Sequence, residues 1–93
     1  MADEALERRL RIVNTKGLHA RASAKFVQCT AKFDAQVTVF KDGQSVAGTS
    51  IMGLMMLGAG PGSEVIVRAS GGQAREALDA LERLVTTKFG EDT

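Results

Sequence analysis

Residues 8–26 read RRLRIVNTKGLHARASAKF, and the hydrophobic period of the sequence changes in the middle of this stretch. Leucine and isoleucine first alternate with arginine, which predicts a strand over residues 8–13 with one face in a core. Apolar residues then recur at three- and four-residue steps, which predicts a helix over residues 20–33. The residues between, 14–18, are expected to form a loop. His19, the only histidine in the chain, falls at or just before the first turn of this helix.

The apolar stripe of this predicted helix consists of Ala22, Phe26, Cys29 and Phe33. We expect Cys29 to act as a small buried hydrophobe rather than as a reactive thiol, because it lies on this stripe. Four residues fall outside the stripe: Ser23, Lys25, Gln28 and Lys32.

The rest of the chain also alternates between strand and helix patterns. Asp42-Gly43 is a strong signal for a two-residue hairpin turn, because both residues tolerate a positive φ. Thr49 or Ser50 is placed to cap the short helix that follows. Further strands are predicted at residues 36–40, 45–47 and 65–69, and helices at residues 51–57 and 73–88.

The last predicted helix has the clearest amphipathic pattern, and we expect Asp79 and Arg83 to pair on its exposed side. The predicted elements follow the order β-α-β-β-α-β-α, which suits an antiparallel sheet with one face covered by helices. The sequence therefore predicts a single α+β domain over residues 1–93, an open-faced β-sandwich. The buried stripe of the last helix is expected to be Ala74, Ala77, Leu78, Leu81, Leu84 and Val85.

Composition narrows the classes of function. Twelve Lys and Arg residues stand against eleven Asp and Glu, and the chain has no Trp or Tyr. Nucleic-acid binding, which usually needs clustered basic charge and stacking aromatics, is therefore not expected. One His and one Cys are too few for a dedicated transition-metal site. The N-terminal segment lacks the apolar centre of a signal peptide, and the longest apolar run, residues 51–59, is too short to cross a bilayer. We expect a soluble, cytoplasmic protein.

The position of His19 favours phosphoryl chemistry. A helix N-terminus gathers free backbone N–H groups and the positive end of the helix dipole, which bind phosphate and disfavour a charged imidazolium. A neutral imidazole has the lone pair that a nucleophile needs, and Arg21 can add a cation with several donors. On spacing alone, a histidine near a helix start is more often an ordinary surface residue, and this alternative stays open.

The motifs of common enzymes are missing from the sequence. No catalytic triad can be assembled, and GAGPGS at residues 58–63 lacks the lysine and the spacing of a Walker A motif. We therefore expect no ATP and no cofactor. If His19 is phosphorylated, another protein must deliver the group, so the chain is expected to be a carrier rather than an enzyme.

GLHARAS at residues 17–23, followed by Ser50 in GTSIMGLMMLGA, resembles the HPr family. HPr proteins are the histidine-containing phosphocarriers of the phosphoenolpyruvate-dependent phosphotransferase system (PTS). The resemblance covers nearly the whole chain and implies four antiparallel strands with three helices on one face of the sheet. The chain departs from the family at Ala22, where the family usually has proline. Alanine keeps the helix, but it lacks the fixed φ that proline gives to a first turn.

The resemblance also implies roles for particular residues. His19 would accept the phosphoryl group through Nδ1 from Enzyme I and pass it to an EIIA-type protein, and Arg21 would steady the phosphate. Ser50 would correspond to the serine that HPr kinase/phosphorylase modifies in many members. The protein would be a monomer, because one surface must serve successive partners. That partner-binding surface would comprise Ala20, Ala24, Ile51, Met52 and Met55.

Two alternatives remain open for the region around Ser50. The residues themselves allow the helix at 51–57 either to expose an apolar docking face, with Leu54 and Leu57 in the core, or to be buried on both faces. Ser50 is fully explained as a helix N-cap, although a regulatory phosphate there is compatible with that role. The second hypothesis for the whole chain is a regulatory binding module whose partner choice depends on its phosphorylation state.

Overall fold

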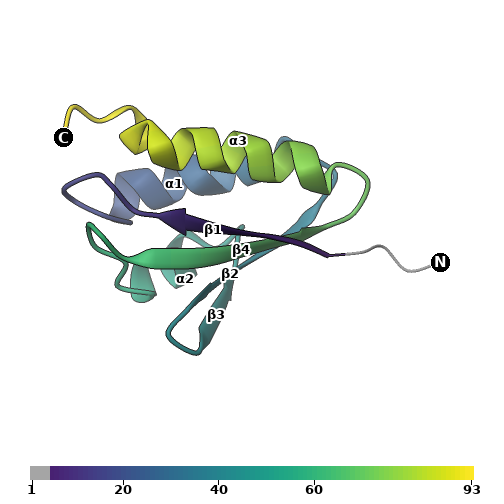
Figure 1. The fold of residues 1–93 in the computed structure, drawn as a ribbon, viewed down its shortest axis with the longest axis horizontal. Helices are drawn as coiled ribbons and strands as arrows, with labels where there is room; N and C mark the ends of the chain where they lie inside the picture. Colours follow the sequence, from purple (N-terminus) through teal and green to yellow (C-terminus); the bar gives the residue numbers. More distant parts are fainter. Residues whose placement is uncertain (1–4) are drawn as a thin grey trace.

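The computed structural model describes residues 5–93 and contains a four-stranded antiparallel sheet with three helices and a final 3₁₀ turn (Figure 1). The strands are β1 (Leu6–Arg11), β2 (Gln36–Lys41), β3 (Gln44–Ala47) and β4 (Glu64–Ser70). The helices are α1 (Ala20–Thr30), α2 (Ile51–Met56) and α3 (Ala74–Thr86), and the turn η1 spans Lys88–Gly90. The predicted order β-α-β-β-α-β-α and the α+β open-faced sandwich are confirmed.

The sheet has the strand order β1-β4-β2-β3. The hairpin between β2 and β3 turns at Asp42 and Gly43, whose φ angles of 50° and 80° are those of the predicted two-residue turn. Helices α1 and α3 lie side by side over one face of the sheet, and α2 contacts α1 and β3 (Figure 1). The other face of the sheet is open to solvent.

The core lies between the sheet and the helices, and its residues follow the predicted periods. Leu10 and Ile12 of the first strand region are buried, while Arg9 and Arg11 are exposed. Leu54 and Leu57 anchor α2 in the same core. The stripe on α3 is buried as predicted, except that Leu84 is only half-buried.

The observed α1 differs from its prediction in length and in its buried face. It ends at Thr30 because the following turns tighten, with the N–H of Phe33 donating to the Thr30 carbonyl oxygen at 3.2 Å. Ser23 lies outside the predicted apolar stripe but is fully buried, and its hydroxyl donates to the Leu18 carbonyl oxygen at 3.1 Å. Cys29 is half-buried rather than buried, and desolvation raises the pKa of its thiol, which keeps it protonated.

The predicted pair between Asp79 and Arg83 is also wrong. The Asp79 carboxylate instead accepts from Arg8 of β1 at 2.6 Å, and Glu82 accepts from the same guanidinium at 2.9 Å. Because α3 packs across β1, a tertiary partner was available that helical spacing alone does not reveal. Within residues 5–93, no helix is long and apolar enough to span a membrane.

Candidate functional site

The loop before α1 holds His19 in place through close backbone contacts. Gly17 has a φ of +65°, and a Cβ there would lie 2.3 Å from the Ala59 carbonyl oxygen, so only glycine fits without a backbone shift. That same oxygen accepts the Leu18 N–H at 2.9 Å. The loop therefore packs directly against the segment that follows α2. This contact restricts the backbone of Gly17 and Leu18, the two residues before His19.

His19 is the N-cap of α1, as its position in the sequence predicted. Its backbone is extended, with φ −73° and ψ −179°, and its carbonyl oxygen accepts the Ser23 N–H at 2.8 Å. The imidazole does not cap the helix, so the ring is available for other contacts. The first N–H groups of an α-helix have no intrahelical acceptor, and they lie next to this ring.

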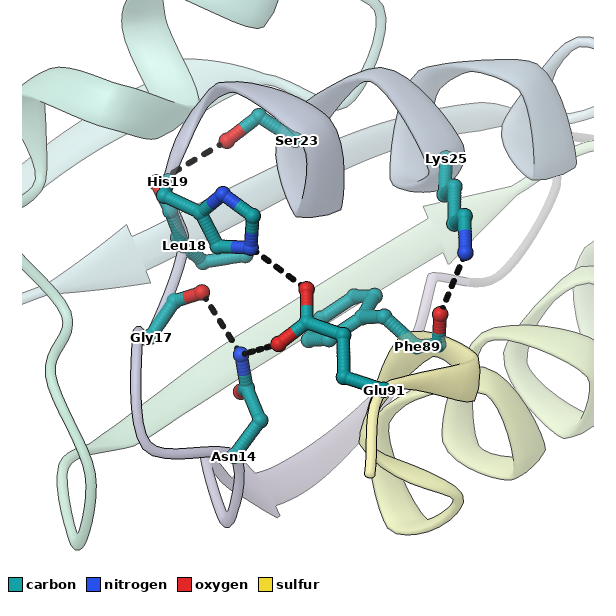
Figure 2. Close-up of polar contacts among 8 residues, drawn as sticks. All are labelled: Asn14, Gly17, Leu18, His19, Ser23, Lys25, Phe89 and Glu91. Carbon is teal, nitrogen blue, oxygen red and sulfur yellow. Dashed lines mark hydrogen bonds and ion pairs between the residues drawn. The ribbon is translucent and has the colours of Figure 1, made fainter. Parts of the chain in front are cut away.

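The ring of His19 contacts a residue that the sequence did not suggest. Its Nε2 lies 2.5 Å from Oε2 of Glu91, and Oε1 of the same carboxylate accepts from Nδ2 of Asn14 at 3.0 Å (Figure 2). The hydrogen bond from His19, followed by that from Asn14, lowers the pKa of the Glu91 carboxyl. Only 27% of the His19 side chain and 14% of the Glu91 side chain remain exposed, so the pair is partly shielded from water.

The C-terminal segment reaches His19 through an unusual left-handed turn. Helix α3 was predicted to run to residue 88, but it ends at Thr86. Lys88, Phe89 and Gly90 then have φ angles of 61°, 56° and 78°. A left-handed conformation costs a non-glycine residue about 1–3 kcal/mol, so neighbouring contacts must hold the turn. Phe89 is buried in the core, and Nζ of Lys25 donates to its carbonyl oxygen at 2.6 Å.

Three cationic residues and the C-terminal segment lie around His19 on its exposed side. Lys16, Arg21 and Lys25 line a shallow hollow of about 300 Å³ together with His19 and the chain from Gly90 to Thr93. Arg21 is exposed, and among residues 5–93 its guanidinium has no ion-pair partner. The structure thus brings Arg21 and His19 to one hollow, and this guanidinium is available for an anion.

An apolar surface lies beside this hollow. Met55 lines a second, neighbouring hollow together with His19 and Lys16. Among the large apolar residues that the structure describes, Met52 and Met56 are the most exposed, at 71% and 75%. We call Ile51, Met52, Met55 and Met56 the α2 patch. Of the two alternatives left open for this helix, the structure selects the exposed apolar face, since Ile51, Met52 and Met55 are exposed; Met56, also exposed, was not predicted.

Ala20 and Ala24, the two predicted docking residues on α1, are exposed and half-buried, respectively. Ser50 is the N-cap of α2: its Oγ accepts from the Gly53 N–H at 2.9 Å. The structure therefore selects Ser50 over Thr49 as the cap and places its hydroxyl at the end of the α2 patch.

The arrangement suits transfer of a compact anionic group and little else. It offers one imidazole, one free guanidinium and one helix N-terminus in a shallow hollow, without the depth that encloses a small-molecule substrate. Within residues 5–93, no group of three His, Cys, Asp or Glu side chains is placed to hold a metal ion.

Known proteins share both the sequence and the fold. The family described as the PTS HPr component phosphorylation site matches residues 6–87. Phosphocarrier protein HPr of Cupriavidus necator is 48% identical over 86 residues, which cover 92% of this chain and 97% of that protein. The crystal structure of HPr-C-His from Thermoanaerobacter tengcongensis matches with a TM-score of 0.90 and 44% identity, covering 95% of this chain and 99% of that chain. A structure described as the HPr dimer from the same organism matches with a TM-score of 0.74 and 46% identity, covering 88% and 94%.

These matches define the class of the protein as a bacterial phosphocarrier of the phosphotransferase system. The chain belongs to the PTS HPr family, and the resemblance carried by residues 17–23 and Ser50 is confirmed.

Proposed function

We propose that this protein carries a phosphoryl group on His19, taking it from phospho-Enzyme I and passing it to an EIIA-type protein. The observation that carries this proposal is the difference in contacts between the two ring nitrogens of His19. Nε2 is held by Glu91, whereas Nδ1 has no partner among residues 5–93 and points away from Glu91 (Figure 2). A ring nitrogen with a free lone pair, beside a helix N-terminus and Arg21, is what a phosphoryl acceptor requires.

In the proposed step, the lone pair of Nδ1 attacks the phosphorus in line with the bond to the donor. The Nδ1–P bond forms as the bond to the donor's leaving atom breaks, and that atom keeps the electron pair. Arg21 and the first N–H groups of α1 stabilise the negative oxygens of the transferred group. Transfer to the EIIA-type protein reverses these events, so the chain turns over no substrate of its own and acts as a carrier rather than an enzyme.

Partner proteins would dock on the α2 patch and on Ala20 and Ala24. Two observations support this surface: its methionines are exposed, and Met55 borders the same hollow as His19. Methionine is a pliable contact residue and suits successive partners. We propose that residues 1–93 act as one HPr-like domain and as a monomer, so that this surface stays free between encounters.

The second candidate function is regulation of partner binding through phosphorylation of Ser50. A phosphate on its hydroxyl would sit at the N-terminus of α2 and would place close to two negative charges beside the α2 patch. An HPr kinase/phosphorylase-type enzyme would add this group. Partner choice would then depend on which of His19 and Ser50 is phosphorylated.

The direct test is incubation with phosphoenolpyruvate and Enzyme I, followed by intact-mass measurement. We expect one acid-labile phosphate on the wild-type protein and none on His19→Ala. The Ser50→Ala variant is the matched control and should still be charged. No adduct on the wild-type protein, under conditions that charge a known HPr, would refute the carrier function.

A further inference from the structure

The contact between Glu91 and His19 is part of a built arrangement rather than a chance surface pair. Asn14, which is fully buried, donates from Nδ2 both to the Gly17 carbonyl oxygen at 2.9 Å and to Oε1 of Glu91 at 3.0 Å. One amide therefore ties the loop that carries His19 to the carboxylate that contacts its ring. Figure 2 shows Asn14, Glu91 and His19 joined in this order.

The backbone that presents Glu91 is equally constrained. Three successive left-handed residues turn the chain back toward α1, and the central one, Phe89, is buried in the core. Lys25 of α1 binds the carbonyl oxygen of Phe89, and the Thr15 N–H donates to the carbonyl oxygen of Thr93 at 3.2 Å. Strained conformations of this kind persist only where surrounding contacts impose them. The position of the Glu91 carboxylate is thus fixed from several sides.

The chemistry of the contact decides which ring nitrogen is free. An ionised carboxylate only accepts hydrogen bonds, so Nε2 of His19 must carry the hydrogen. In a neutral imidazole, the lone pair then resides on Nδ1. When Nδ1 forms a bond to phosphorus, the ring becomes a cation that retains its Nε2 hydrogen. The carboxylate lies 2.5 Å from that nitrogen, where it stabilises the new charge.

We propose that Glu91 is a positioning residue for phosphoryl transfer: it selects the Nε2–H tautomer of His19, presents Nδ1 to the donor and offsets the positive charge that forms on the ring. This inference rests on the proposed function of His19. No proton leaves the ring during the step, since the electron pair that forms the Nδ1–P bond comes from the nitrogen and the donor atom keeps its own pair.

The first arm of the test is nitrogen-15 and proton NMR of the unphosphorylated protein at alkaline pH. In the wild type we expect a downfield Nε2–H signal from His19, protected from exchange by the carboxylate. Glu91→Ala should lose this signal to exchange with water, while Glu76→Gln, at an exposed position of α3 away from the hollow, should keep it. Retained backbone amide spectra show that each variant is folded. A signal that is absent from the wild type, or unchanged in Glu91→Ala, overturns the proposal.

The second arm measures the rate of charging by phospho-Enzyme I at sub-saturating carrier. Glu91→Gln, which keeps the size of the side chain and removes its charge, should be charged roughly tenfold more slowly, and Glu76→Gln on α3 at the wild-type rate. Lost Nε2–H protection with unchanged charging overturns the positioning role. Failure of the wild type to be charged at all refutes the proposed function, and the positioning role falls with it, whereas the NMR arm still decides whether the contact exists.

Discussion

At the scale of single residues, His19 shares one hollow with a carboxylate and a guanidinium of opposite charge. Glu91 engages Nε2, and Arg21 lies in the same hollow with a free guanidinium. The two charged residues would serve different moments of transfer. Glu91 would stabilise the cation that forms on the ring, whereas Arg21 would stabilise the negative oxygens of the phosphoryl group. Lys16 and Lys25 also add positive charge to the hollow. That charge would replace neither the carboxylate of Glu91 nor the planar set of donors of Arg21.

The role of Arg21 can be separated from overall charge by substitution. We predict that Arg21→Ala lowers the rate of charging by phospho-Enzyme I roughly 100-fold, because one donor to the developing charge is lost. Arg21→Lys should recover only part of the rate, since a point charge lacks the planar set of donors. Arg75→Ala, which removes an exposed arginine from α3, is the control. Equal rates for Arg21→Ala and Arg75→Ala would show that Arg21 contributes only to net charge.

At the scale of elements, the very short helix α2 depends on its cap and on its packing against the preceding strand. The Ser50 hydroxyl binds the Gly53 N–H, and a Cβ on Gly53 would lie 3.0 Å from both that hydroxyl and the Cβ of Val46. The N-cap hydrogen bond from Gly53 to Ser50 and the close packing against Val46 thus both occur at the N-terminal end of α2, beside the α2 patch. A charge added to Ser50 would change the proposed docking surface, whereas the helix itself should tolerate it.

This separation gives a specific prediction for Ser50→Asp. Aspartate is as good an N-cap as serine, so the fold should be retained. The added negative charge should weaken docking and slow charging at sub-saturating carrier roughly tenfold, with little change at saturation. Ser50→Asn, an equally good cap without charge, should behave as wild type. Identical kinetics for Ser50→Asp and Ser50→Asn would contradict an electrostatic effect on docking.

The elements themselves were largely predictable from the sequence, because period and turn chemistry are local. Leu10 and Ile12 marked the first strand, and Asp42-Gly43 marked the hairpin. The differences arose where a contact from outside the helix intervened, from the adjoining loop in one case and from a distant strand in the other. Ser23 is buried because the loop before α1 folds over it, and Asp79 pairs with Arg8 because α3 crosses β1. The spacing of residues along a helix predicts neither of these contacts.

At the scale of the whole molecule, the site forms only when the loop before α1 meets the segment that follows α3. Asn14 and His19 precede or begin α1, whereas Glu91 follows α3 at the other end of the sequence. The motif at residues 17–23 led to the prediction that His19 and Arg21 are site residues, and it gave no indication of Glu91, which contacts His19. Glu91 has no distinguishing spacing, and the left-handed turn at residues 88–90 reverses the helix pattern that precedes it. Only the packing of α3 beside α1 brings this carboxylate to the histidine.

The hydrogen bonds of Glu91 with His19 and Asn14 should make the free energy of unfolding depend on pH. The pKa of Glu91 lies below its ordinary value of 4.5, so its stabilising contribution is complete above that pH and is lost as the pH falls through the folded-state value. We predict that the wild type unfolds with a higher free energy than Glu91→Gln at pH 6, and that the difference shrinks steadily below pH 4.5. Urea unfolding of both proteins from pH 6 to pH 3 measures this. A difference that is constant or grows in acid would contradict it.

The most direct test of the account is to determine which ring nitrogen of His19 carries phosphorus after charging. Nitrogen-15 labelling of the histidine and phosphorus-31 NMR of the phosphorylated protein identify that atom through its coupling to phosphorus. The account predicts a single phosphohistidine with phosphorus on Nδ1 and hydrogen on Nε2, facing Glu91. Phosphorus on Nε2, or a phosphate attached to a residue other than His19, would contradict it.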